Sequence, residues 1–191
     1  MKYMNLLNFY ETNMIIKPED VYFFGNIKTV RPQLSKWAKS GKLIELRKGY
    51  YLLPKKIKKY PPHFYIANTI YFPSYISLQS ALSFYGLIPE AVYSITSVST
   101  RKTYEIKNKL GNFIYRQIKK ELFFGYKLHK INDFPVLIAE PEKAIIDLIY
   151  LSHSDTKSFR LQNHEILNKQ TIKLYLKKYP KWVNKKIEEI L

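Results

Sequence analysis

The sequence predicts an α+β protein in two parts: an N-terminal winged helix-turn-helix, followed by a larger mixed α+β domain with a mostly antiparallel sheet and C-terminal helices. Residues 3–53 carry helical patterns and then two short strand patterns, whereas residues 92–139 carry strand patterns in succession. Strands that follow one another without alternating helices favour an antiparallel sheet. A segment rich in Lys and Pro lies between the two regions.

This segment, residues 55–62, is the predicted linker. Four lysines run into Tyr60-Pro61-Pro62, and consecutive prolines remove donors and disfavour helix in the residue before them. The chain therefore divides into domains of residues 1–59 and 60–191. Up to residue 60 there are 13 Lys and Arg against 4 acids, and after it 19 against 11, so the charge density is higher in the smaller part.

Two helices are predicted before residue 26. The first follows from apolar and aromatic residues at helical spacing: Tyr3, Leu6, Leu7 and Tyr10. The second begins at Pro18, whose fixed φ suits a first turn, and Glu19 and Asp20 favour the positive end of the helix dipole. Gly25 marks its end.

The third helix has Thr29 as its predicted N-cap and Gly41 just past its end. Pro32 would then lie in the first turn, where its missing N–H is harmless. One stripe of this helix is apolar: Val30, Leu34, Trp37 and Ala38. Its other face is polar and basic, with Arg31 and Gln33 flanking the boundary.

A hairpin is predicted after this helix, because residues 43–46 and 50–53 are short strand patterns around Arg47-Lys48-Gly49. Three residues ending in glycine suit a turn with an αL position. Three helices followed by a hairpin is the order of a winged helix-turn-helix. In that fold the third helix enters the major groove and the basic hairpin tip lies over the DNA backbone.

In the larger domain, Ser77 can cap a helix that Gly86 ends, and Pro141 suits the first turn of another. Other helices are predicted over residues 63–71, 168–178 and 180–191. Strands are predicted over residues 92–100, 112–118, 122–126 and 136–139. These patterns predict that the larger domain is α+β.

The composition indicates which kind of partner and which cellular compartment to expect. A net charge of +17 and a pI near 9.8 favour a polyanion such as DNA, RNA or an anionic membrane surface; the alternative is a generally lysine-rich proteome. The absence of cysteine excludes disulfides and thiolate sites and fits a reducing cytosol. No signal peptide or membrane-length apolar run is visible, so we expect a cytoplasmic protein without a membrane partner.

The predicted partner is double-stranded DNA, contacted by two sets of residues. The candidates on the recognition helix are Arg31, Gln33, Ser35, Lys36 and Lys39. Of these, Arg31 and Gln33 can make bidentate contacts to guanine and adenine, respectively. The candidates for the DNA backbone and the wing, which set affinity and not sequence, are Lys28, Thr29, Lys42, Arg47, Lys48, Lys55 and Lys56.

No catalytic site is predicted, so we expect no enzymatic activity, no cofactor and no metal. Glu142, Lys143 and Asp147 suggest a nuclease-like acid cluster, but carboxylates five residues apart lie about 140° apart around a helix. This favours a helix start with a structural ion pair. The four histidines lack the spacing of metal pairs, and Ser77 and Ser80 lie in no Gly-x-Ser-x-Gly motif.

Several segments occur in a characteristic order: residues 39–51 (KSGKLIELRKGYY), 75–90 (YISLQSALSFYGLIPE), 111–118 (GNFIYRQI), 123–125 (FFG) and 138–151 (IAEPEKAIIDLIYL). Together they resemble the AbiEi antitoxin family over roughly residues 1–151. The resemblance implies a transcriptional regulator of a type IV toxin-antitoxin system, which acts in abortive phage infection. Its winged helix would bind inverted repeats in its own promoter, and its C-terminal domain would counteract a nucleotidyltransferase-like toxin without requiring a stable complex. The tail from Ser152 onward matches no motif.

Two other interpretations stay open. The same cations and tyrosines suit an RNA-binding or ribonucleoprotein-associated basic protein without operator specificity. An enzyme acting on a toxin or a nucleotide would need a site in the larger domain that the sequence does not show.

Overall fold

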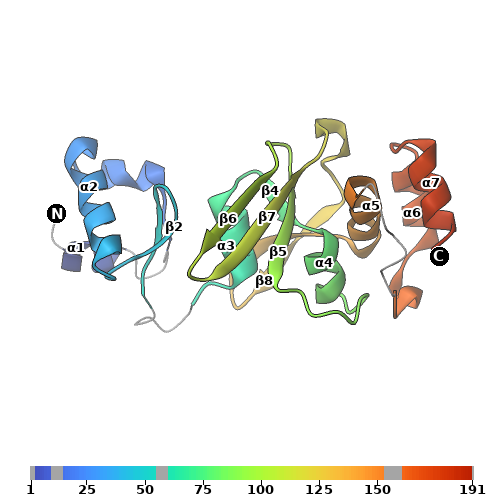
Figure 1. Ribbon diagram of the computed structural model, residues 1–191, viewed down its shortest axis with the longest axis horizontal. Coiled ribbons are helices and arrows are strands. Elements are labelled where there is room, and N and C mark those ends of the chain that lie inside the picture. The colour runs from blue at the N-terminus through green and yellow to red at the C-terminus, as the bar shows by residue number, and fades with distance from the viewer. Residues whose placement is uncertain (1–2, 10–14, 55–59, 153–160, 191) are drawn as a thin grey trace.

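The computed structural model describes residues 3–9, 15–54, 60–152 and 161–190, and it confirms a mixed α+β protein. Figure 1 shows three regions along the longest axis: the N-terminal helices with a small sheet, a six-stranded sheet in the middle, and the last two helices at the far end. The small sheet and the large sheet are thus built from different parts of the chain.

The N-terminal part alternates helices with the strands of a three-stranded sheet. Its elements are α1 (Tyr3–Phe9), β1 (Ile15–Ile16), η1 (Pro18–Phe24), α2 (Ile27–Lys39), β2 (Ile44–Arg47) and β3 (Tyr50–Leu52). The strand order is β1-β3-β2, with both pairings antiparallel. The helix that starts at Pro18 and the hairpin are therefore confirmed, although η1 is a 3-10 helix and β1 was not predicted.

The start of α2 differs from the prediction. Asn26, not Thr29, is the N-cap, and its Oδ1 accepts a hydrogen bond from the Lys28 N–H at 2.9 Å. Asparagine is at least as strong an N-cap as threonine, so the helix gains nearly one turn. Pro32 is consequently the sixth residue of α2 and lies in its interior, not in its first turn. Its missing N–H deprives the carbonyl of Lys28 of the usual partner, on the exposed side of the helix where water has access.

The end of α2 is as predicted. Gly41 has φ +74°, its N–H donates to the Ala38 carbonyl at 3.1 Å, and the Lys42 N–H donates to the Trp37 carbonyl at 2.9 Å. These two bonds form a Schellman motif, which needs a left-handed residue at Gly41. The motif ends the helix and directs the chain into β2.

The large sheet has the strand order β6-β7-β5-β4-β9-β8. Its strands are β4 (Ser74–Ile76), β5 (Ser94–Ser99), β6 (Tyr104–Asn108), β7 (Gly111–Gln117), β8 (Tyr126–Ile131) and β9 (Phe134–Ala139). The expected mostly antiparallel sheet is confirmed, with parallel pairings of β5 with β7 and of β4 with β9. The strand predicted over residues 122–126 is wrong, because η2 (Lys120–Leu122) and the left-handed Gly125 (φ +69°) precede β8.

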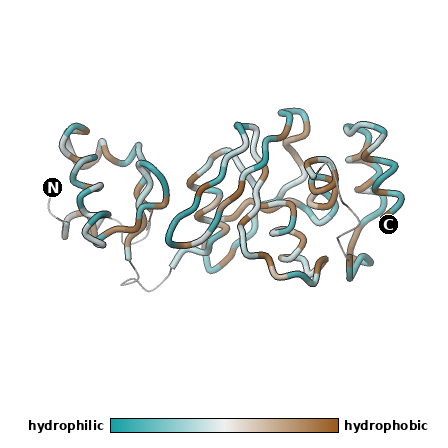
Figure 2. Tube along the Cα trace, in the orientation of Figure 1, coloured by the Kyte–Doolittle hydropathy of each residue, from teal (hydrophilic) through white to brown (hydrophobic). Residues whose placement is uncertain are grey.

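The helices of the larger domain cover this sheet and extend beyond it. They are α3 (His63–Ile70), α4 (Leu78–Phe84), α5 (Pro141–Ser152), η4 (His164–Ile166), α6 (Lys169–Leu176) and α7 (Lys181–Glu188). α5 contacts α4 on one side and α6 and α7 on the other. In Figure 2 hydrophobic segments recur along the central strands and α5, whereas the last two helices are mostly hydrophilic. α5 is therefore the central helix of this domain.

The small sheet belongs to two cores. Ile16 and Tyr51 pack with the buried residues of α2 and η1, whereas Ile15 and Leu52 pack with the core of the larger domain. Neighbouring residues of a strand point to opposite faces, so a sheet between two cores buries both faces. Leu46 joins the larger core as well. The sheet thus connects the N-terminal part to the larger domain.

Candidate nucleic-acid interface

The outer face of α2 is basic. The helix contains no carboxylate, and its cations are Lys28, Arg31, Lys36 and Lys39. All four side chains are exposed, and within the described part of the chain none of them forms an ion pair. The opposite face buries Val30, Leu34 and Trp37. The apolar stripe therefore orients the helix so that its positive charges are available to an anionic partner.

The structure separates the two predicted base readers. Arg31 is exposed and Gln33 is half-buried. Two residues apart on a helix, the two side chains lie about 160° apart around the axis. Half-buried Ser35 lies on the same side as Arg31. One duplex groove can therefore meet Arg31 and Ser35 together, but not Arg31 and Gln33.

A groove of about 690 Å³ runs between α2, η1 and the β2–β3 hairpin; we call it the helix–hairpin groove. Its lining residues are Pro18, Val21, Arg31, Pro32, Leu34, Ser35, Glu45, Lys48, Gly49 and Tyr51. It brings Arg31 and Ser35 of α2 beside Lys48 of the hairpin turn. Three predicted site residues from two elements thus share one concave surface.

Arg47 has a different role from the predicted one. Its Nη1 donates a 2.6 Å hydrogen bond to the carbonyl of Ile70, at the end of α3. Its guanidinium also lies over the rings of Tyr50 and Tyr71, with 4.9 and 5.8 Å between Cζ and the ring centroids. A guanidinium held in this way ties the hairpin to the larger domain, and we do not count it among the phosphate contacts.

The remaining residues that were predicted to contact the DNA backbone differ in their surroundings. Thr29 donates from Oγ1 to the Asn26 carbonyl at 2.8 Å, so its hydroxyl serves the first turn of α2. Lys42 is exposed after the end of α2, with its ammonium 5.6 Å from the ring centroid of Tyr3. Lys55 and Lys56 lie outside the described residues.

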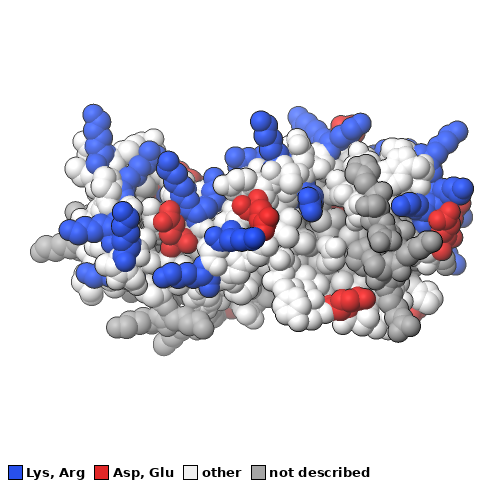
Figure 3. All heavy atoms as spheres, in the orientation of Figure 1, with Lys and Arg blue, Asp and Glu red and all other residues white. Residues whose placement is uncertain are grey.

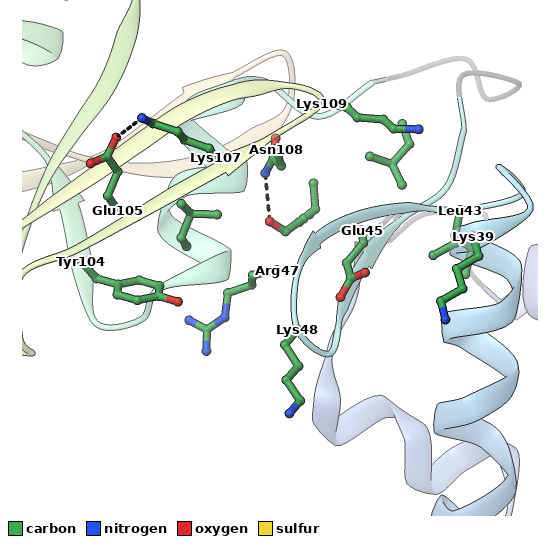
Figure 4. A pocket seen from close by; sticks show the side chains of 14 residues that line it. Lys39, Leu43, Glu45, Arg47, Lys48, Tyr104, Glu105, Lys107, Asn108 and Lys109 are labelled. Atoms are coloured by element: carbon green, nitrogen blue, oxygen red, sulfur yellow. Dashed lines mark hydrogen bonds and ion pairs between the residues drawn. The ribbon is translucent and has the colours of Figure 1, made fainter.

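A second hollow of about 510 Å³ lies between the hairpin and the larger domain; we call it the interdomain groove. It is lined by residues 38–39, 43–48 and 104–109. Figure 4 shows Lys39, Glu45 and Lys48 on one side and Tyr104, Lys107 and Lys109 on the other. The sequence did not point to the contribution of β6, because those residues are distant along the chain from α2.

The interdomain groove is positive overall. Its lining contains five cations, Lys39, Arg47, Lys48, Lys107 and Lys109, and two acids, Glu45 and Glu105. Figure 3 shows Lys and Arg spread over both sides, with acidic residues between them. A hydrogen bond from Asn112 and the nearby Lys107 ammonium lower the pKa of Glu105, and its carboxylate lies 3.4 Å from Lys107 Nζ. Glu105 therefore stays ionised and partly neutralises Lys107.

The larger domain contains a different kind of charged cluster, around Lys143 and Asp147 of α5. Both side chains are fully buried and form an ion pair one helical turn apart. The Asp147 carboxylate also accepts hydrogen bonds from Tyr75 and Ser77 at 2.9 Å and from Tyr179 at 3.2 Å. We call these five residues the buried polar cluster. It joins β4, the start of α4, α5 and the segment after α6.

Burial controls the ionisation of the buried polar cluster. Desolvation lowers the pKa of Lys143, and the charge of Asp147 opposes this effect. Desolvation raises the pKa of Tyr75 well above its usual value, and the Asp147 carboxylate raises it further. Tyr75 is therefore a neutral donor. Every side chain of the cluster is buried, and its hydrogen bonds connect elements that are distant along the chain.

The predicted structural ion pair in α5 is present, between Lys143 and Asp147. The two carboxylates do not converge, because Glu142 Oε1 instead accepts a 2.8 Å hydrogen bond from the N–H of Asn168. Within the described residues no group of three His, Asp or Glu side chains could hold a metal ion. The predicted cap Ser77 is at the start of α4, but its hydroxyl is used by Asp147.

Comparison with protein-family models and with curated proteins finds no match for this chain. Within the part of the chain that the structure describes, no helix combines the length and the apolar character needed to cross a membrane.

Proposed function

We propose that the protein binds double-stranded DNA through the outer face of α2 and the turn of the β2–β3 hairpin, and that it represses its own promoter. The observation that carries this proposal is the exposed face of α2, which has four cations, no carboxylate and no ion pair to another described residue. Neutralising phosphates with such cations releases condensed counterions, which is the main source of affinity for DNA.

The order of the elements supports the same proposal. Helix, strand, helix, helix and two further strands follow one another in residues 3–52, and the hairpin comes directly after α2. This is the order of a winged helix domain, in which the helix before the hairpin enters the major groove. We assign base contacts to Arg31 and Ser35, and phosphate contacts to Lys28, Lys36, Lys39, Lys42 and Lys48.

A role for the larger domain as an antitoxin is the second half of the proposal. Its support is the resemblance of residues 75–90 and 138–151 to the AbiEi family, together with the way in which these two segments meet. Tyr75 and Ser77 from the first segment contact Lys143 and Asp147 from the second. The residues that carry the resemblance thus hold the domain together. Co-expression with a neighbouring nucleotidyltransferase-like toxin, with growth as the readout, tests this half.

Fluorescence anisotropy tests the DNA-binding half. The duplex is the region upstream of the gene, compared with a shuffled duplex and with single-stranded RNA of the same sequence, at several salt concentrations. We expect preference for the upstream duplex. Replacing Lys36 and Lys39 by alanine should reduce the salt slope by about 1.8, at about 0.9 per phosphate contact.

The matched control replaces two exposed lysines of α7, Lys181 and Lys185, by alanine at the far end of the molecule. An equal reduction of the slope in the control would show a nonspecific effect of net charge. Preference for RNA over the upstream duplex would contradict the repressor function.

A further inference from the structure

We propose that the interdomain groove is a second phosphate-binding surface, which holds the sugar–phosphate backbone of the same duplex beside α2. This inference rests on the proposed function and gives the larger domain a direct part in DNA binding. Its residues come from both parts of the chain: Lys39 and Lys48 from the N-terminal part, and Lys107 and Lys109 from β6 and the turn after it.

Contacts with the hairpin hold the β6–β7 turn at a defined position. Asn108 Nδ2 donates a 2.9 Å hydrogen bond to the carbonyl of Leu46 in β2, and Asn108 Oδ1 accepts a 2.8 Å bond from the N–H of Leu110. Leu46 is buried in the larger core. Because Asn108 lies between Lys107 and Lys109, these two lysines are held next to the hairpin.

The chemistry of the groove suits a phosphodiester backbone. Lysine binds phosphate as a point charge on a flexible chain, so it needs no fixed planar geometry to contact a phosphodiester. Two acids in the lining, Glu45 and Glu105, weaken the attraction but leave it positive against five cations. Binding of a phosphate near Lys107 would have to compete with Glu105, whose carboxylate lies 3.4 Å from the ammonium.

Duplex backbone suits the groove better than a single strand does. Proteins that bind single strands stack successive bases on several aromatic rings. Among the described residues that line the groove, Tyr104 is the one aromatic side chain. Its ring already stacks on Tyr71, with 5.6 Å between centroids and 16° between planes. The groove therefore has charge for phosphates but little surface for bases.

The test is a salt titration of duplex binding by Lys107→Gln/Lys109→Gln, with the full chain. Glutamine keeps a polar side chain, shorter than lysine by one atom, and the double substitution removes two charges. We expect the slope of log K against log salt to fall by about 1.8 relative to wild type. The α7 pair Lys181→Gln/Lys185→Gln is the matched control and should keep the wild-type slope. Circular dichroism and the thermal midpoint establish that each variant is folded.

The substitution Glu105→Gln should change the affinity for the duplex in the opposite direction. It removes a negative charge from the groove and frees Lys107, so the affinity for the duplex should rise. Increased duplex affinity in Glu105→Gln and a reduced salt slope in Lys107→Gln/Lys109→Gln would together support phosphate binding in the interdomain groove.

Each failure has a separate meaning. If the wild-type protein binds the duplex and Lys107→Gln/Lys109→Gln has the wild-type slope, the groove assignment is overturned and the α2 proposal stands. If the α7 control loses as much slope, the groove assignment is also overturned. If the wild-type protein does not bind duplex at low salt, or binds single-stranded RNA more tightly, the proposed function fails and the groove assignment fails with it.

Discussion

In the N-terminal part of this protein the cations of α2 lie on the surface, whereas the larger domain places one lysine in its centre. Lys36 and Lys39 of α2 are exposed, and no described residue pairs with them. Lys143 of α5 is fully buried with Asp147. The same residue type therefore serves two purposes. On the surface its charge is available to a partner, and in the core it is committed to fixed neighbours.

The free-energy cost of removing a charge from water explains why exposed and buried lysines serve different purposes. An exposed charge keeps its hydration and contributes little to stability, so surface lysines can be arranged for binding without a large effect on folding. A buried charge loses its hydration, and this loss is offset only by its ion pair and hydrogen bonds. We therefore expect variants of the buried polar cluster to change stability, and variants of α2 to change DNA affinity.

The largest effect is expected for Asp147→Ala. The substitution leaves the Lys143 ammonium without its carboxylate in the core, and it removes the acceptor of Tyr75, Ser77 and Tyr179. The free energy of unfolding should fall by about 3–5 kcal/mol, measured by urea denaturation. Lys143→Met/Asp147→Leu, which removes both charges, should recover part of the loss. A decrease of under about 1 kcal/mol for Asp147→Ala would show that the pair is not buried as described.

The second-largest loss of stability is expected for Gly125→Ala. Gly125 has φ +69°, and an added Cβ would lie 3.1 Å from Lys143 Cγ and 3.1 Å from Tyr175 Cε2. Backbone strain and displaced neighbours together should lower the free energy of unfolding by about 2–4 kcal/mol. Gly41→Ala is the matched control, because Gly41 has φ +74° but no described atom within 4 Å of the added Cβ. Equal losses in the two variants would mean that packing against Lys143 contributes nothing.

Arg47→Ala should have an intermediate effect. The variant loses the hydrogen bond to the Ile70 carbonyl and the contacts with Tyr50 and Tyr71. We expect the free energy of unfolding to fall by about 1–2 kcal/mol, with little change in the salt slope of DNA binding. Thermal unfolding and anisotropy are measured on the same sample. A reduced salt slope of DNA binding with unchanged stability would show that Arg47 contacts a phosphate and does not support the fold.

The smallest effect on stability is expected for Lys36→Ala/Lys39→Ala. Both side chains are exposed, so the free energy of unfolding should stay within about 0.5 kcal/mol of wild type. The same variant should lose duplex affinity. If stability falls as much as for Arg47→Ala, these lysines support the fold, and the division between surface and buried cations would no longer hold.

Local patterns were sufficient for much of the fold. The stripe of Val30, Leu34 and Trp37 predicts the buried face of α2, and Pro141 predicts the start of α5. Such features depend on residues within one or two turns of each other. The start of α2 was placed wrongly, because Asn26 and Thr29 are both competent caps and local sequence does not choose between them.

The site could be predicted only in part. The cations of α2 and Lys48 follow from helical spacing and turn chemistry, and the structure brings Arg31, Ser35 and Lys48 into one groove. The role of Arg47 could not be predicted, because its acceptor at Ile70 lies 23 residues away. Lys107 and Lys109 were missed for the same reason, although the alternating pattern of β6 does place charged residues on one side.

By itself, the sequence determined the α+β class, the buried stripe of α2, the hairpin turn at Gly49 and the excess of positive charge. These depend on periodicity, backbone preference and composition, which are local or global properties of the chain. The tertiary structure alone decided which cations stay free. It placed Arg47 against α3, Lys143 beside Tyr75 and Asp147, and Lys107 and Lys109 across a groove from Lys48. The physical reason is that a cation is free or committed according to neighbours that are distant along the chain and become adjacent only when the chain folds.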